Sequence, residues 1–172
     1  MKITLKKIKH IKFASHETNN FVADLYVDGK PFAIVSNDGQ GGSDMHYKHE
    51  KNPQSNAEFN DELKRISKWH EENTTYNTEY DDRGFIEGDL DITVSQLLET
   101  YLLEKEVKRL MARNMIIFEK GKKGFFKYGK KKYNITANSM GAFKFKISKW
   151  HKDWVCINDM PINQAVAHFI AN

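Results

Sequence analysis

The sequence predicts an α+β fold that forms a single domain over residues 1–172, and three observations support this class. Apolar and polar residues alternate with period two near the N-terminus, two central stretches have helical periodicity, and alternation returns after Met115. The chain is 40% hydrophobic and long enough for one core. We therefore expect an N-terminal antiparallel β-meander, two principal helices, a second Lys-rich β region and a short C-terminal helix.

The meander is predicted from three strand patterns. Residues 2–14 alternate with one slip, which indicates a strand containing a bulge. Residues 21–27 and 32–36 alternate more regularly, and Asp28-Gly29 between them supplies the positive φ values of a two-residue type I′ turn. Residues 46–53 follow as an exposed connection.

Capping residues mark the two principal helices. Ser55 and Glu58 form a capping-box pattern that begins a helix ending near residue 72. Thr93 and Gln96 repeat this pattern and are expected to begin the longest helix, which ends near residue 114. The polar residues 73–91 lack periodicity, which predicts a loop.

The second half of the chain predicts strands and then a helix. Apolar or alternating runs indicate strands at residues 115–118, 125–129, 131–137 and 142–150. A short amphipathic helix follows, with Pro161 in its first turn.

Charge is strongly polarised along the sequence. Residues 50–100 carry 5 basic and 13 acidic side chains, whereas residues 101–150 carry 14 basic and 3 acidic ones. Either the two segments lie against each other and partly neutralise, or the basic segment presents a face to a polyanion.

A glycine-rich loop follows the meander and is a candidate ligand site. Its small residues allow backbone N–H groups to converge on an anion such as a phosphate or nucleotide, and its side-chain oxygens suit a hard cation. A simple structural turn is the other interpretation. The candidate residues are Asn37, Asp38, Gly39, Gly41, Gly42, Ser43 and Asp44.

A Lys-rich, aromatic segment is the candidate polyanion-binding site. Lysines neutralise phosphates and exposed aromatic rings stack on bases, which is the combination used on single-stranded nucleic acid. An amphipathic hairpin with buried aromatic residues and solubilising lysines is the alternative. The candidates are Lys122, Lys123, Lys127, Tyr128, Lys130, Lys131, Lys132, Lys144 and Lys146.

Other titratable residues give no specific motif. His46 and His49 have the spacing of a metal-ligand pair on a helix, but the neighbouring Pro53 favours a loop, so no metal site is predicted. The pairs Asp81-Asp82 and Asp89-Asp91 are interpreted as solvated charge. No catalytic residue and no cofactor are assigned.

The single cysteine, Cys156, excludes an intramolecular disulfide and indicates a reducing compartment. No stretch approaches the length of a membrane span, so no membrane partner is expected. The expected location is the cytoplasm.

The run SHETNNFVADLYVDGKPFAIVSNDGQGGSD, with a charged helical region and a late strand pair beginning near MIIF, resembles a family of small uncharacterised proteins encoded by phages and related mobile elements. The resemblance covers about the first fifty residues and, more weakly, residues 114–128. It implies an accessory protein of the host cytoplasm that binds a host or phage macromolecule, or a small signalling ligand.

These observations lead to three hypotheses of function. The first is a non-enzymatic protein that binds an acidic macromolecule, either nucleic acid or a host protein, through a basic, aromatic β surface. The second is a small-ligand protein that holds a phosphate or nucleotide signal in the loop of residues 37–44. The third is a small hydrolase.

Overall fold

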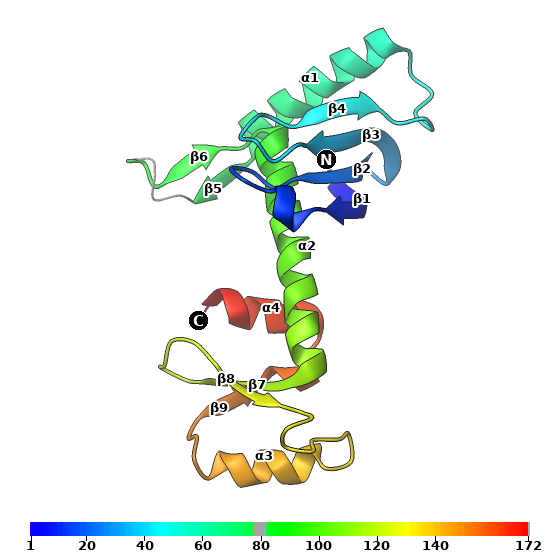
Figure 1. Cartoon of the computed structure of the whole chain (residues 1–172). Coiled ribbons are helices and arrows are strands. Elements are labelled where there is room, and N and C mark those ends of the chain that lie inside the picture. The colour runs from blue at the N-terminus through cyan, green and yellow to red at the C-terminus, as the bar shows by residue number, and fades with distance from the viewer. Residues whose placement is uncertain (78–81, 172) are drawn as a thin grey trace. The chain divides into compact units, whose positions relative to one another are not determined.

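The computed structural model describes residues 1–77 and 82–171 and shows an α+β fold with an N-terminal antiparallel meander (Figure 1). This confirms the predicted fold class. Its contacts group the chain into two compact units, residues 1–99 and residues 100–172. The single-domain organisation stays a prediction. No helix in the described part of the chain is long and apolar enough to cross a membrane.

The first unit contains a four-stranded antiparallel sheet in the order β1-β2-β3-β4. The predicted bulge is present in β1, where the register shifts between Lys6 and Lys9. Asp28 and Gly29 have φ values of 47° and 82°, as the predicted turn requires. The connection expected at residues 46–53 instead begins with a strand, β4. The strand bounds are Ile3–His10 for β1, Phe21–Val27 for β2, Lys30–Asn37 for β3 and Met45–Lys48 for β4.

Helix α1 (Asn56–Asn73) begins at the predicted capping box. The Ser55 backbone N–H donates to Glu58 Oε2 at 2.7 Å, and the Glu58 N–H donates to Ser55 Oγ at 3.3 Å. After α1 the loop expected at residues 73–91 contains a hairpin of β5 (Thr75–Asn77) and β6 (Phe85–Glu87). Residues 78–81 of that loop, including Asp81, lie outside the described residues.

Helix α2 (Leu90–Arg113) begins four residues before the start predicted from a cap at Thr93. Asp89 caps it, because Asp89 Oδ1 accepts the N–H of Ile92 at 2.7 Å. The Thr93 hydroxyl donates to the Asp89 carbonyl at 2.8 Å and is therefore inside the helix. The predicted C-terminal end, near residue 114, is confirmed.

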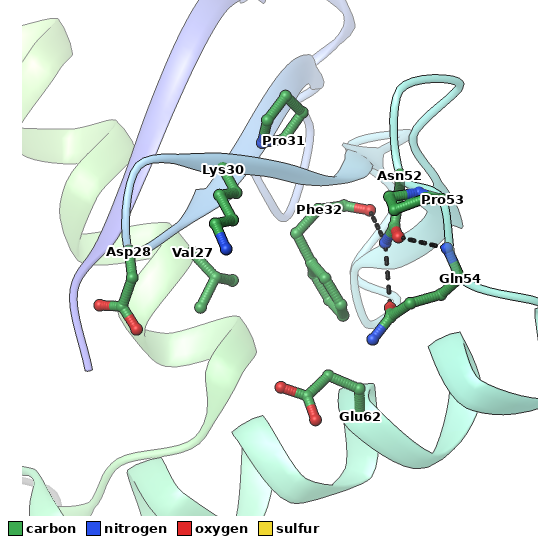
Figure 2. Close-up of a pocket in the computed structure, with 9 residues that line it drawn as sticks. All are labelled: Val27, Asp28, Lys30, Pro31, Phe32, Asn52, Pro53, Gln54 and Glu62. Atoms are coloured by element: carbon green, nitrogen blue, oxygen red, sulfur yellow. Dashed lines mark hydrogen bonds between the residues drawn. The ribbon is translucent and has the colours of Figure 1, made fainter.

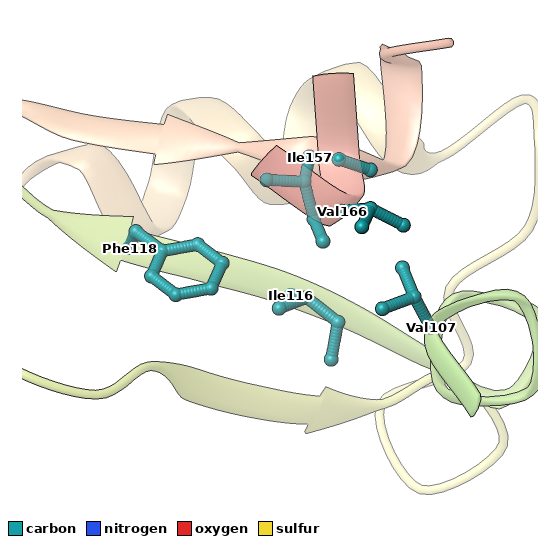
Figure 3. Close-up of a cluster of buried hydrophobic side chains, with 6 residues drawn as sticks. Val107, Ile116, Phe118, Ile157 and Val166 are labelled. Carbon is teal, nitrogen blue, oxygen red and sulfur yellow. The ribbon is translucent and has the colours of Figure 1, made fainter. Parts of the chain in front are cut away.

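The second unit has a three-stranded antiparallel sheet with β7 (Asn114–Glu119) between β8 (Phe126–Gly129) and β9 (Trp154–Cys156). Both faces of β7 are buried, which explains its continuous apolar sequence. One face packs in the cluster Val107, Ile116, Phe118, Ile157, Ala165 and Val166, most of which is drawn in Figure 3. The other face packs in the cluster Met115, Ile117, Ile135 and Ile147.

Two strands expected in the second unit are wrong. Residues 131–137 form turns, and residues 142–150 lie mainly in helix α3 (Met140–Ser148). Phe143 and Ile147 are four residues apart, so the helix places both on the cluster under β7, while Phe145 between them points outward. The sheet of this unit is thus smaller than predicted.

The remaining helices are short. The C-terminal helix α4 (Ile162–Ala171) is confirmed, and Pro161 directly precedes it and accepts its first backbone hydrogen bonds. Two 3₁₀ turns complete the fold, η1 (Lys12–Ala14) and η2 (Ile157–Asp159).

Candidate functional sites

The glycine-rich loop is organised by the side chain of Asn37, at the end of β3. Asn37 Oδ1 accepts hydrogen bonds from the Thr18 hydroxyl at 2.7 Å and from the N–H of Gly39 at 2.9 Å. Its Nδ2 donates to the carbonyl of Gly42 at 2.8 Å and to Asp44 Oδ1 at 2.9 Å. A single buried amide therefore fixes both ends of the loop.

Gly39 lies in close contact with the connection that follows β1. The Gly39 carbonyl accepts the N–H groups of His16 and Glu17, each at 3.0 Å. Its φ is +83°, and a Cβ at this position would overlap the carbonyl oxygen of Ala14. Both the conformation and the space require glycine.

Several backbone N–H groups of the loop that an anion would use already donate to oxygen atoms of the chain. The Gln40 N–H donates to Asp38 Oδ1 at 3.0 Å, and the Gly41 N–H donates to the Thr18 hydroxyl at 3.3 Å. The Asp44 N–H donates to Asp91 Oδ2 at 3.1 Å. An anion would have to displace these oxygens and approach carboxylates, so the local electrostatics do not favour one.

A small cavity of about 110 Å³ lies between this loop and the first turns of α2. Asp44 from the loop and Asp91 from the helix contribute its carboxylates, and Phe21 and Leu98 contribute apolar surface. Burial raises the pKa of Asp44 to about 6, helped by the nearby carboxylates of Asp91 and Asp89. Burial also raises the pKa of Asp91.

His46, on β4, faces the same carboxylates. Its Nε2 lies 3.8 Å from Asp91 Oδ1, and burial lowers the pKa of its imidazole. His49 points elsewhere, with its Nε2 3.6 Å from Asp24 Oδ2. The two histidines therefore do not meet, and within residues 1–77 and 82–171 no three His, Cys, Asp or Glu side chains are placed to hold a metal ion.

A larger pocket of about 360 Å³ lies between the β2–β3 turn and α1 (Figure 2). Phe32 forms an apolar wall, and the polar atoms beside it bond to one another. Asn52 Nδ2 donates to the Phe32 carbonyl at 3.0 Å and to Gln54 Oε1 at 3.2 Å. Glu62, at the rim, pairs with Arg65. Sequence patterns gave no signal for this pocket, and its Asn52, Gln54 and Glu62 side chains already have partners.

The predicted lysines of the second unit lie in the β7–β8 turn, on β8, in the turns after it and on α3. Lys122 pairs with Glu119 at 2.9 Å, and Lys144 pairs with Asp159. Among the described residues the other candidate lysines form no ion pair, namely Lys123, Lys127, Lys130, Lys131, Lys132 and Lys146.

Tyr128 is half-buried rather than displayed for stacking. Its hydroxyl is hydrogen-bonded to His151 Nε2 at 2.8 Å, and its ring packs edge-on against Tyr133 and Phe143, with each pair of ring centroids 5.7 Å apart. His151 Nδ1 in turn faces Glu119 Oε2 at 3.3 Å. Tyr128 thus belongs to an internal network.

Sequence reasoning missed the two most exposed aromatic residues in the described part of the second unit. Phe145 is 71% exposed and Trp150 is 66% exposed. Lys146 and Lys149 are exposed beside them, and Lys149 Nζ lies 5.6 Å from the centre of the Phe145 ring. We call these four residues the α3 surface. In the sequence, Met140, Phe143 and Ile147 recur at helical spacing, and this pattern could have predicted that Phe145 faces outward.

No protein-family model, curated protein sequence or solved structure matches this chain.

Proposed function

We propose that residues 100–172 bind single-stranded nucleic acid with little sequence preference, through the α3 surface and neighbouring lysines. The observation that carries the proposal is the exposure of Phe145 and Trp150 beside Lys146 and Lys149. Exposed aromatic rings that lie beside cations are suited to stack on bases whose phosphates the cations neutralise.

Charge supports the same assignment. Residues 100–172 carry 15 basic and 5 acidic side chains, a net charge of +10, whereas residues 1–99 carry 12 basic and 18 acidic ones, a net charge of −6. Nearly all the cations are lysines, which neutralise phosphate as point charges but do not form the bidentate contacts by which arginine reads guanine. Affinity without strong sequence preference follows from this composition.

The surface differs from the β surface that sequence patterns suggested, since its aromatic residues come from a helix and the turn after it. The resemblance to phage-encoded proteins would make host or phage nucleic acid in the host cytoplasm the natural target. That source is part of the proposal.

The test is fluorescence anisotropy of a labelled oligothymidylate strand titrated with the full chain at low salt. Phe145→Ala and Trp150→Ala should each weaken binding by about tenfold, because stacking contributes roughly 1–3 kcal/mol per base. Both side chains are exposed, so the fold should be retained by circular dichroism.

Phe13→Ala is the matched control. Phe13 is 89% exposed and follows Lys12 in the first unit, so it tests whether any exposed ring beside a lysine contributes to binding, and its loss should leave binding unchanged. If Phe13→Ala weakens binding as much as Phe145→Ala, the contact is unspecific. If no nucleic acid binds at low salt, the proposal fails and an acidic host protein becomes the remaining candidate partner.

A further inference from the structure

Three side chains of the second unit form a chain of hydrogen bonds that ends at a hydroxyl group. Tyr128 Oη lies 2.8 Å from His151 Nε2, and His151 Nδ1 lies 3.3 Å from Glu119 Oε2. The three residues come from β8, from the connection between α3 and β9, and from β7. A hydroxyl, an imidazole and a carboxylate in this order form the arrangement by which a base activates a nucleophile.

The direction of these hydrogen bonds follows from the charge of Glu119. Lys122 lies 2.9 Å from Glu119 Oε1 and lowers the pKa of that carboxyl, with a smaller contribution from His151. An ionised carboxylate only accepts hydrogen bonds, so His151 Nδ1 carries a proton and donates it to Glu119. In a neutral imidazole Nε2 is then an acceptor, and the Tyr128 hydroxyl donates to it.

Tyr128 needs such a base in order to react. Burial raises the pKa of its hydroxyl, so the phenolate does not form by itself near neutral pH. Phe126 packs on the imidazole of His151, with the two ring centroids 4.2 Å apart, and helps to hold it in place. None of the three side chains is fully buried, and that of His151 is 13% exposed. The group therefore lies at the border with solvent.

The charge around this group indicates which reactant fits. Lys127 and Lys130 flank Tyr128 in the sequence, and Lys152 follows His151. Among the described residues none of these three lysines forms an ion pair. Ammonium groups stabilise the negative charge that develops on a phosphoryl group under attack. A phosphodiester of the nucleic acid is therefore the reactant that the local charge favours.

We propose that Tyr128 attacks a phosphodiester of bound single-stranded nucleic acid, with His151 as its general base; this role rests on the function proposed above. A bond forms between Tyr128 Oη and phosphorus, and the bond from phosphorus to one of its two ester oxygens breaks. The proton passes from Tyr128 to His151 Nε2 and then to the departing oxygen. One fragment of the strand is released with a hydroxyl end, and the other stays attached to Tyr128 as a phosphotyrosyl ester.

The test uses the full chain and oligothymidylates that carry a p-nitrophenyl phosphodiester at the 3′ or the 5′ end. Attack by Tyr128 releases coloured p-nitrophenolate and leaves the oligonucleotide bound covalently to the chain. We expect about one equivalent of p-nitrophenolate per chain and an adduct that persists on a denaturing gel. Mass spectrometry of the digested adduct should locate it at Tyr128. The end that reacts identifies the departing oxygen.

Two variants test the reacting pair. Tyr128→Phe should abolish the release of p-nitrophenolate, because it removes the nucleophilic oxygen. His151→Gln should slow the release by about 100-fold, since a general base contributes roughly 10²–10⁴-fold to a rate. Melting curves verify that both variants fold, and the mass-spectrometric mapping does not depend on either of them.

Tyr133→Phe is the matched control. Tyr133 is 45% exposed and packs against Tyr128, but its hydroxyl has no histidine partner among the described residues. This variant should release p-nitrophenolate as fast as the unmodified chain. Glu119 is a positioning residue, and Glu119→Gln keeps a hydrogen-bond acceptor without the charge. It should slow the release at saturating oligonucleotide without weakening the binding measured by anisotropy.

Anisotropy with the same oligonucleotides separates the nucleophilic role of Tyr128 from nucleic-acid binding. Binding without release or adduct overturns the nucleophilic role and leaves the proposed function standing. Release that persists in Tyr128→Phe, or an adduct mapped to another residue, also overturns it. An absence of binding refutes both.

Discussion

At the scale of single residues, Asn37 and Gly39 determine the shape of the glycine-rich loop. The amide of Asn37 makes four hydrogen bonds that fix the loop ends. Gly39 permits the loop to approach the chain that follows β1. These contacts together place Asp44 beside α2, where its backbone N–H donates to Asp91.

Gly39→Ala should destabilise the protein by about 2 kcal/mol, because the methyl group meets the Ala14 carbonyl and the left-handed conformation disfavours alanine. Gly42→Ala should change stability by less than about 0.5 kcal/mol, since a Cβ there meets nothing within 4 Å. Urea unfolding followed by circular dichroism compares the two variants. Equal costs would show that the loop relaxes freely around Gly39.

The sequence identified the loop but only part of the cavity. The cluster of Gly, Asn and Asp residues indicated a turn with oxygen ligands, and Asn37 and Asp44 are indeed brought together. Asp91 was interpreted as solvated charge, because it is 47 positions away from Asp44 and no local pattern connects the two. Contacts between distant residues depend on the tertiary fold, which periodicity does not encode.

At the scale of elements, α3 shows that a helix and a strand formed by the same residues expose different side chains. Residues 142–150 alternate in sequence, and alternation favours a strand. The helix is selected because Met140, Phe143 and Ile147 all reach the cluster on one face of β7. Elements with unambiguous terminal signals were predicted well, as the Ser55 capping box and the Asp28-Gly29 turn illustrate.

Phe143→Ala should lower the free energy of unfolding by about 2 kcal/mol, because its half-buried ring packs against Tyr128 and Tyr133. Phe145→Ala should leave the free energy of unfolding within about 0.5 kcal/mol of the unmodified chain. Chemical denaturation of both variants measures the difference. A larger loss of stability for Phe145→Ala than for Phe143→Ala would indicate that residues 142–150 form a strand with Phe145 buried.

At the scale of the whole molecule, charge is divided between the two units, with a net of −6 in residues 1–99 and +10 in residues 100–172. Composition predicted this polarisation. It could not indicate which aromatic residues accompany the basic charge at the surface, because that depends on the burial of each ring.

Lys130→Glu combined with Lys131→Glu should weaken nucleic-acid binding and flatten the dependence of log affinity on log salt. Each lost phosphate contact reduces the slope by about 0.7 on a single strand, so two contacts change it by about 1.4. Lys51→Glu with Lys64→Glu makes the same charge change in the first unit and should leave the slope unaltered. Anisotropy titrations over a series of salt concentrations measure it, and equal slopes for both pairs would remove the second unit as the binding surface.

The bulge in β1 has a consequence for how copies of this chain behave beside one another. β1 is an edge of the four-stranded sheet, and a flat edge strand invites pairing with a second molecule. Lys7 adopts a φ of 51° in the bulge and reaches Asp24 at 2.8 Å, so the edge is interrupted and carries a fixed charge pair. The slip in the first strand thereby makes this edge of the sheet a poor template for pairing with another chain.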